Sequence, residues 1–247
     1  MIPAYNEGSR LLSTLSECVT YLASLPYPTE LIVADDGSSD DTFSVATRFA
    51  AHHPTVHAIS ILHGGKATAL RAGMSAADGE LIAFSDADLA TPLSYLAHFV
   101  ALAESGADIV AGSREGSTAS RIGEPWYRHA MGRIFNRLVQ LLLIPGINDT
   151  QCGFKLFKRA VILDLLSTAR LYTVGQGVAG ARVTAFDVEL LAIARLRGFH
   201  LVMEPVIWRY GDQSKVNPAR DSLYNLRDVL AVFVNAKLGR YAGKAKP

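Results

Sequence analysis

The chain has 247 residues, with 24 Lys and Arg against 23 Asp and Glu, which gives a formal net charge of +1. That length suits one large α/β domain with a sizeable core, and the near-zero charge excludes a general affinity for nucleic acid. The two cysteines show neither metal-type spacing nor the density of a disulfide framework, which predicts a reducing, cytoplasmic setting. The sequence shows no signal-peptide pattern and no apolar stretch of about 20 residues, so we expect a protein that can lie on a membrane without crossing it.

In the first half, short apolar runs alternate with longer helical patterns, which predicts βα units that feed a mostly parallel sheet. The expected strands are 31–34, 57–62, 81–84 and 109–111, and the expected helices are 7–23, 41–52, 66–77 and 92–104. Only Met1 and Ile2 precede the turn at 3–6. We therefore expect a curtailed first strand, which suggests a truncated or misassigned N-terminus.

The second half is expected to cover one end of that sheet rather than form a second domain. Its expected elements are a helix at 126–144, a strand at 154–157, a helix at 185–196 and a strand at 201–208, with a mobile glycine-rich loop at 173–180.

The last predicted helix, 221–238, is amphipathic and is followed by basic residues. Such a segment can lie in a membrane interface, although a core-packing helix with a solvated basic tail fits the pattern equally well. We accordingly divide the chain into a main domain at 1–220 and a terminal helix with a basic tail at 221–247. The apolar face predicted for the terminal helix consists of Leu223, Leu226, Leu230 and Phe233.

Two carboxylates, Asp86 and Asp88, follow the predicted strand 81–84. The carboxyl end of a parallel strand meets the crevice where α/β sheets bind ligands. Carboxylates there can hold Mg²⁺ or Mn²⁺, which would neutralise the charge that grows on a departing nucleoside diphosphate. An Asp-x-Asp triplet alone is a weak signal, because many such triplets are solvated turns.

A second carboxylate pair, Asp35 and Asp36, also ends an apolar strand, so two strand ends are expected to direct acidic groups at one crevice. Asp35 is suited to accept hydrogen bonds from a base or ribose, while Asp36 can serve the turn alone. A glycine pair and Lys66 begin the next helix, where backbone N–H groups, the helix dipole and an ammonium favour a phosphate. An ordinary surface lysine is the alternative for Lys66.

Taken in order, the segments 2–7, 34–38, 65–66, 86–88 and 112–114 resemble the family 2 glycosyltransferases. More narrowly, the segments 149–157, 186–191 and 214–215 resemble the dolichyl-phosphate β-glucosyltransferase branch of that family. The likeness spans nearly the whole chain. It implies a GT-A fold, with a mostly parallel central sheet flanked by helices and a C-terminal amphipathic helix.

The resemblance also implies a reaction and a donor site. The reaction is transfer of a hexose, with UDP-glucose favoured as donor, to a polyprenyl or dolichyl phosphate, with inversion to a β-linked product and with Mg²⁺ or Mn²⁺ as cofactor. The implied donor site consists of Pro3, Ala4, Tyr5, Glu7 and Asp35 around the nucleotide, Asp86, Ala87 and Asp88 at the nucleotide and metal, and Lys66 and Lys215 near the diphosphate.

The acceptor half needs groups that orient a phosphate beside the anomeric carbon, and the fixed fork of arginine suits that task. By resemblance, Arg114 and Arg128 are the expected clamp, with Arg133 as a third candidate; surface salt bridges are the alternative reading for each. Because a phosphate is already ionised at neutral pH, the reaction needs no strong general base.

The remaining polar residues of the motifs are given supporting roles. Gln151 is expected to hydrogen-bond the donor sugar or a metal-bound oxygen. Asp149, Asp187 and Glu189 are interpreted as architecture around the pocket, with contact to the donor sugar as a second role for Asp187, and Cys152 as a packed side chain rather than a nucleophile.

Three other activities are compatible with parts of this pattern. A family 2 transferase that acts on a saccharide or protein hydroxyl would need an aspartate base and no arginine clamp. A nucleotidyltransferase could share the sheet and the carboxylates but would attack phosphorus. A non-catalytic nucleotide-sugar sensor would keep the fold alone, and the intact Asp86, Asp88 and Lys66 argue against it.

Overall fold

The computed structural model describes residues 1–173, 184–211 and 218–243, with the backbone alone for 218–221. Its sheet begins with three parallel strands in the order β1-β2-β3, and Ile2 lies opposite Val33. Their bounds are β1 Ile2–Ala4, β2 Leu31–Asp35 and β3 Val56–Ser60. The first strand is therefore short, as expected, but it is paired along its length, which fixes the position of the turn that follows it.

Four further strands extend the sheet in the order β4-β7-β5-β8. Two hydrogen bonds join β4 to the start of the chain, from the Met1 amino group to the Ala83 carbonyl (2.6 Å) and from the Ser85 amide to the Met1 carbonyl (3.1 Å). The complete order is β3-β2-β1-β4-β7-β5-β8, in which β7 runs antiparallel to both neighbours. The bounds are β4 Leu81–Ser85, β5 Ile109–Ser113, β7 Phe154–Lys158 and β8 Leu201–Pro205.

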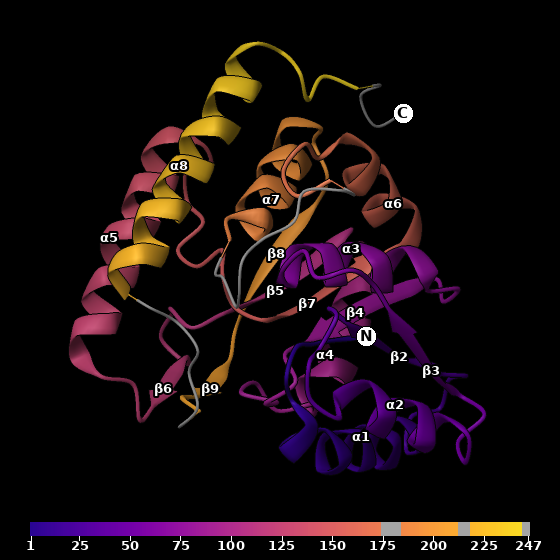
Figure 1. Cartoon of the computed structure of the whole chain (residues 1–247). Helices are drawn as coiled ribbons and strands as arrows, with labels where there is room; N and C mark the ends of the chain where they lie inside the picture. The colour runs from indigo at the N-terminus through magenta and orange to yellow at the C-terminus, as the bar shows by residue number, and fades with distance from the viewer. Residues whose placement is uncertain (174–183, 212–217, 244–247) are drawn as a thin grey trace.

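Helices cover both faces of this sheet (Figure 1). Consecutive strand residues point to opposite faces, so Ile109 packs in one hydrophobic cluster and Val110 in the other. One cluster lies beneath α1 (Gly8–Ala23), α2 (Thr42–Ala50) and α4 (Tyr95–Glu104), and the other beneath α3 (Lys66–Ala76), α6 (Arg159–Thr168) and α7 (Phe186–Leu196). Strands buried on both faces explain the unbroken apolar runs in the sequence.

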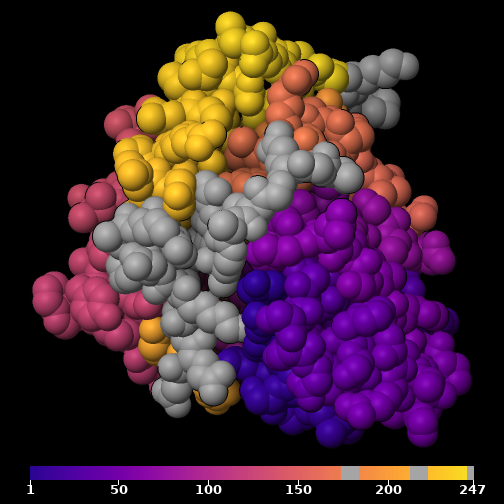
Figure 2. Space-filling model, viewed as in Figure 1, coloured from indigo at the N-terminus to yellow at the C-terminus, as the bar shows by residue number. Residues whose placement is uncertain are grey.

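The remaining two helices lie side by side, away from the N-terminal half of the chain (Figures 1 and 2). They are α5 (Trp126–Leu142) and α8 (Pro218–Lys237). On α8, Val229 and Val232 are fully buried in the second cluster, so this helix belongs to the core on one side. Among the described residues, no helix combines the length and apolar character needed to cross a bilayer.

The second half departs from the sequence-based expectation in three ways. First, β7 and β8 are strands of the central sheet rather than a cover over its end. Second, the predicted strand 201–208 is two strands, because Val206 separates β8 from β9 (Ile207–Arg209), which pairs with β6 (Ser120–Ile122). Third, α6 was not predicted. Most of the expected glycine-rich loop, 174–180, lies outside the described residues.

Candidate active site

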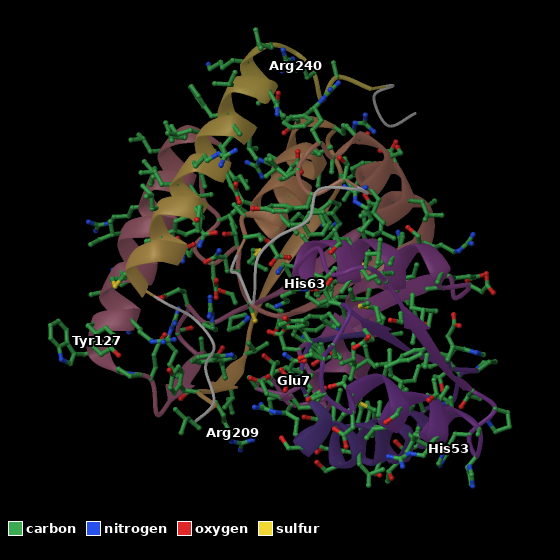
Figure 3. All side chains as sticks on the ribbon, in the orientation of Figure 1. Glu7, His53, His63, Tyr127, Arg209 and Arg240 are labelled. Carbon is green, nitrogen blue, oxygen red and sulfur yellow. The ribbon has the colours of Figure 1, made fainter. Side chains whose placement is uncertain are left out.

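A cavity of about 470 Å³ opens where the carboxyl ends of β1 and β4 meet α5, the start of α7 and β9. In Figure 3, Glu7 lies near the centre of the molecule, on the edge of the N-terminal half that faces α5, whereas Tyr127 lies at the outer rim. The cavity brings together most of the residues predicted from the sequence. Those that line it are Pro3, Ala4, Tyr5, Glu7, Lys66, Asp86, Ala87, Asp88, Arg114, Arg128, Gln151 and Asp187.

Asp35 and Asp36 differ from their expected roles. Asp35 is buried behind the cavity wall, where its carboxylate accepts hydrogen bonds from the Ser60 hydroxyl (3.0 Å) and the Ser38 amide (3.3 Å). Asp36, in contrast, lines the cavity, and its carboxylate accepts the amides of Gly64 (2.9 Å) and Gly65 (2.8 Å). Asp36 thereby holds the loop that begins α3, and the buried Asp35 supports the turn.

Two further predicted residues are absent from the described cavity lining, for different reasons. Arg133 lies on the exposed face of α5, outside the cavity lining. Lys215 lies outside the described residues.

The strand end of β4 carries a compact charged group. The Lys66 ammonium forms an ion pair with Asp86, and the carboxylates of Asp86 and Asp187 outweigh partial desolvation to raise the pKa of Lys66. Loss of solvent and the neighbouring Asp86 raise the pKa of Asp88. Two neighbouring carboxylates, of which one raises the proton affinity of the other, are suited to bind a cation. That cation would lie between the carboxylates and a bound ligand.

No cluster of three or more acidic, His or Cys side chains suited to a metal occurs in the described parts of the chain. A cation at Asp86 and Asp88 would therefore need further oxygen ligands from a bound molecule, which is how Mg²⁺ commonly binds beside phosphates.

Gly153 explains why Asp86 can occupy its position. The Asp86 amide donates to the Gly153 carbonyl (3.2 Å), and a Cβ at residue 153 would lie 2.0 Å from the Asp86 carboxylate. A methyl group at residue 153 would therefore displace the Asp86 carboxylate from the position it has here.

Arg114 is fixed by a buried partner. Its Nε and Nη2 donate to the two oxygens of Asp149 (2.7 and 2.9 Å), and its backbone amide donates to the same carboxylate (2.9 Å). Asp149 is fully buried, which opposes ionisation, but the charge and hydrogen bonds of Arg114 lower its pKa to about 2. The same pairing raises the pKa of Arg114 despite burial. Asp149 accordingly has the architectural role expected of it.

Aromatic rings support the two predicted arginines. Arg114 lies over the ring of Trp208 (5.3 Å to its centroid), and Arg128 lies over the ring of Tyr210 (5.2 Å). The two rings meet edge to face at 5.9 Å. A third cavity arginine, Arg121, forms ion pairs with Glu124 (2.8 Å) and Glu115 (3.0 Å).

Sequence reasoning missed Arg121 and both rings, although Trp208 and Tyr210 are two residues apart, the spacing that places side chains on one side of an extended strand. The inward face of α5 was missed as well, because helical periodicity shows that a face exists without showing what it covers. The cavity residues on that face are Met131, Gly132, Phe135 and Asn136.

Behind Asp187 lies a buried lysine. Lys155 is almost fully buried, and its ammonium lies 3.2 Å from an Asp187 oxygen and donates to the Cys152 carbonyl (2.6 Å). Cys152 itself is fully buried, and burial raises the pKa of its thiol. Both observations agree with a packed cysteine and not with a nucleophile.

Comparison with known proteins defines the class. Residues 1–166 match the model of "Glycosyl transferase family 2". The chain belongs to this family and is a glycosyltransferase.

The relatives that match nearly the whole of this chain agree with the narrower resemblance in the sequence. A Drosophila melanogaster protein named dolichyl-phosphate beta-glucosyltransferase is 34% identical over 98% of this chain and 76% of its own length. The Homo sapiens protein of the same name is 31% identical over 98% of this chain and 76% of its own length.

Solved structures confirm the GT-A fold. A glucosyl-3-phosphoglycerate synthase from Mycobacterium tuberculosis, in complex with Mn²⁺, UDP and glucosyl-3-phosphoglycerate, has a TM-score of 0.65 at 19% identity and covers 96% of this chain and 78% of its own. A mannosyltransferase from Pyrobaculum calidifontis, in complex with GDP-Man and Mn²⁺, has a TM-score of 0.59 at 21% identity. The match covers 100% of this chain and 64% of the mannosyltransferase chain.

Proposed function

We propose that this protein transfers glucose from UDP-glucose to a dolichyl or other polyprenyl phosphate, with inversion, to give a β-linked product. The observation that carries this proposal is one cavity that joins the acidic strand end of Asp86 and Asp88 to the arginines Arg114 and Arg128. The names of the relatives that match 98% of this chain support the acceptor and the sugar.

On the donor side, Pro3, Ala4 and Tyr5 would contact the nucleotide. Asp86 and Asp88 would hold a divalent cation, Mg²⁺ or Mn²⁺, beside the diphosphate. When bound, such a cation stabilises the charge of the leaving diphosphate. Lys66, already oriented by Asp86, supplies a second positive charge at the N-terminus of α3, where helix amides also favour a phosphate.

On the acceptor side, Arg128, with Arg114 beside it, would orient the phosphate so that one oxygen faces the anomeric carbon. That oxygen forms the new bond to carbon, and the bond from carbon to the diphosphate oxygen breaks with its electron pair. No proton moves in this step, because the acceptor enters as an anion.

The carboxylates of the site favour this acceptor over a hydroxyl. Asp149 is held on Arg114 by two side-chain hydrogen bonds, and Asp187 lies beside the Lys155 ammonium. Because the pairing with Arg114 lowers the pKa of Asp149, that carboxylate is a weak general base, and the Lys155 ammonium occupies one side of Asp187. A transferase that acts on a saccharide hydroxyl would need a stronger one.

A lipid acceptor also requires access to a membrane, and we assign that contact to the outer faces of α5 and α8. Trp126 and Leu141 on α5 are each 82% exposed, and Leu223 on α8 is 67% exposed. Figure 2 shows the two helices along one side of the molecule. Basic residues accompany them, namely Arg133, Arg137 and Lys237. This combination is typical of helices that lie in a membrane interface.

The two readings of the terminal helix are therefore compatible, because α8 buries Val229 and Val232 while Leu223, Leu226 and Leu230 stay exposed. We propose that Arg133 serves this outer face, toward lipid headgroups, and that the membrane face concerned is the cytoplasmic one.

The donor half of the proposal is tested by incubating the chain with polyprenyl phosphate vesicles, Mn²⁺ and radiolabelled UDP-glucose or GDP-mannose, with and without a chelator. We expect chelator-sensitive, solvent-extractable label from UDP-glucose only. Label from GDP-mannose alone would replace the proposed sugar, and chelator-resistant transfer would contradict the metal site.

Arg128→Ala is expected to raise the KM for polyprenyl phosphate about 10- to 100-fold, because it removes charge-assisted hydrogen bonds to the acceptor. The KM for the nucleotide-sugar should change little. Steady-state kinetics with each substrate varied in turn measures both values; the acceptor is a short polyprenyl phosphate in detergent, without a bilayer, so that Arg133→Ala serves as the control on the same helix. Equal effects on both substrates, or a larger effect from the control, would remove Arg128 from the clamp.

Gly153→Ala is expected to lower transfer about 10- to 100-fold by displacing Asp86, the range found when groups that orient metal ligands are changed. The measurement is the Mn²⁺ concentration needed for half-maximal rate, which should rise. Gly112→Ala is the control for a tight methyl group elsewhere in the sheet, because its new Cβ would meet the Cys152 sulfur at 3.0 Å and the Phe154 carbonyl at 3.1 Å and not Asp86. An unchanged Mn²⁺ requirement in Gly153→Ala would show that Asp86 does not depend on this glycine.

A further inference from the structure

Two asparagines on facing helices line the cavity with an unmet hydrogen-bonding group. Asn136 on α5 is 6% exposed and Asn225 on α8 is 7% exposed. The side-chain oxygen of each is buried and has no hydrogen-bond partner in the described structure. Buried polar groups in proteins are almost always paired, so two unpaired amide oxygens on residues that line one cavity indicate a ligand.

The position of the pair relates it to the donor side of the cavity. One turn further along α8, Asp228 accepts a hydrogen bond from the Ala185 amide (3.3 Å), so this part of α8 lies against the start of α7. There, Phe186 and Asp187 line the same cavity. Asp187 interacts electrostatically with Lys66, which forms an ion pair with Asp86 at the acidic strand end.

The chemistry of the pair selects a hydroxyl group. An unmet amide oxygen needs a donor, which neither a phosphate nor a prenyl chain can provide. If the side-chain amide is rotated so that its oxygen and nitrogen exchange places, the NH₂ group needs a hydrogen-bond acceptor instead. A hydroxyl both donates and accepts, so it satisfies an amide in either orientation.

We propose that Asn136 and Asn225 form a sugar subsite that binds hydroxyl groups of the donor hexose and so contributes to the choice of sugar. This inference rests on the proposed function, since it takes the ligand to be a nucleotide-sugar. It assigns to these two residues a specificity role that no sequence motif indicated. A site built to pair with a sugar hydroxyl rejects an analogue that lacks it, because the protein group is then left unpaired.

The test compares Asn136→Leu and Asn225→Leu with the wild-type chain by calorimetric titration with UDP and with UDP-glucose in Mn²⁺. Each variant should bind UDP-glucose about tenfold more weakly and UDP unchanged, which corresponds to loss of one hydrogen bond to the sugar. The melting temperature should not fall, because leucine has a similar volume and removes an unmet polar group.

Asn235→Leu is the matched control on α8. Asn235 is also buried, but its amide pairs with the Tyr241 hydroxyl (3.3 Å) and with Arg240 (2.9 Å), and it does not line the cavity. Its replacement should lower the melting temperature and leave both titrations unchanged. In the subsite variants, the loss should disappear for the UDP-deoxyglucose that lacks the recognised hydroxyl.

Equal losses for UDP and UDP-glucose, no loss for either, or a loss confined to the KM for polyprenyl phosphate would overturn the subsite. The same titrations with GDP and GDP-mannose apply if the wild-type chain binds that donor instead. Failure of the proposed function would give a different result. If the wild-type chain binds UDP-glucose through these amides but forms no lipid product, the sugar subsite is supported and the proposed lipid acceptor is excluded.

Discussion

Asp88→Asn is expected to reduce transfer by roughly a thousandfold, because it removes one of the two carboxylates that would hold a divalent cation at the leaving diphosphate. Folding should be preserved. The pKa of Asp88 is raised by loss of solvent and by Asp86, so its ionised form is disfavoured in the folded chain. Without metal, the neutral asparagine should therefore leave stability at pH 7 unchanged or slightly higher.

Transfer rate and melting temperature, each with and without Mn²⁺, measure this prediction. Mn²⁺ should raise the melting temperature of the wild-type chain and not that of the variant. Asp78→Asn is the control, since the Asp78 side chain is 93% exposed and does not line the cavity. Wild-type turnover in Asp88→Asn would exclude Asp88 as a metal ligand.

Asp149→Asn is expected to lower the free energy of unfolding at pH 7 by about 3–5 kcal/mol, because it leaves the Arg114 guanidinium without its buried partner. The pKa of Asp149 is about 2 in the folded chain, below its usual value near 4. The stabilisation is therefore complete above about pH 4 and is lost as the pH falls toward 2.

Denaturant unfolding at several pH values checks this result, with the difference between wild type and variant expected to shrink below about pH 4. The double variant Arg114→Met, Asp149→Leu should be more stable than Asp149→Asn, since removing both charges leaves neither unpaired. A constant difference across this pH range, or a double variant less stable than the single one, would contradict the buried-pair account.

The first half of the fold could be predicted because its signals are local. Apolar runs that end in acidic or glycine-rich turns define β2 and β4, and Asp86 and Asp88 then follow at a strand end by geometry alone. The second half depends on contacts distant in sequence. Nothing in residues 154–158 shows that β7 inserts antiparallel between β4 and β5.

Two predicted site residues, Asp35 and Arg133, lie outside the cavity lining for the same reason. Successive residues at a strand end point in opposite directions, so a difference of one position decides whether Asp35 or Asp36 faces the cavity. Arg133 shares a helix with Arg128 but lies on its outer face. Asn225 reaches the cavity only because α8 packs beside α5, which sequence periodicity does not show.

The acceptor is the central claim, and competition between two lipids tests it most directly. Polyprenyl phosphate and the matching polyprenol are supplied together with labelled UDP-glucose and Mn²⁺, and the lipid products are separated. The site described here predicts label only in an acid-labile glucosyl phosphate diester with a β linkage. Label on the polyprenol, or on a saccharide acceptor added in place of both lipids, would contradict it and would place a hydroxyl in the position assigned to the phosphate.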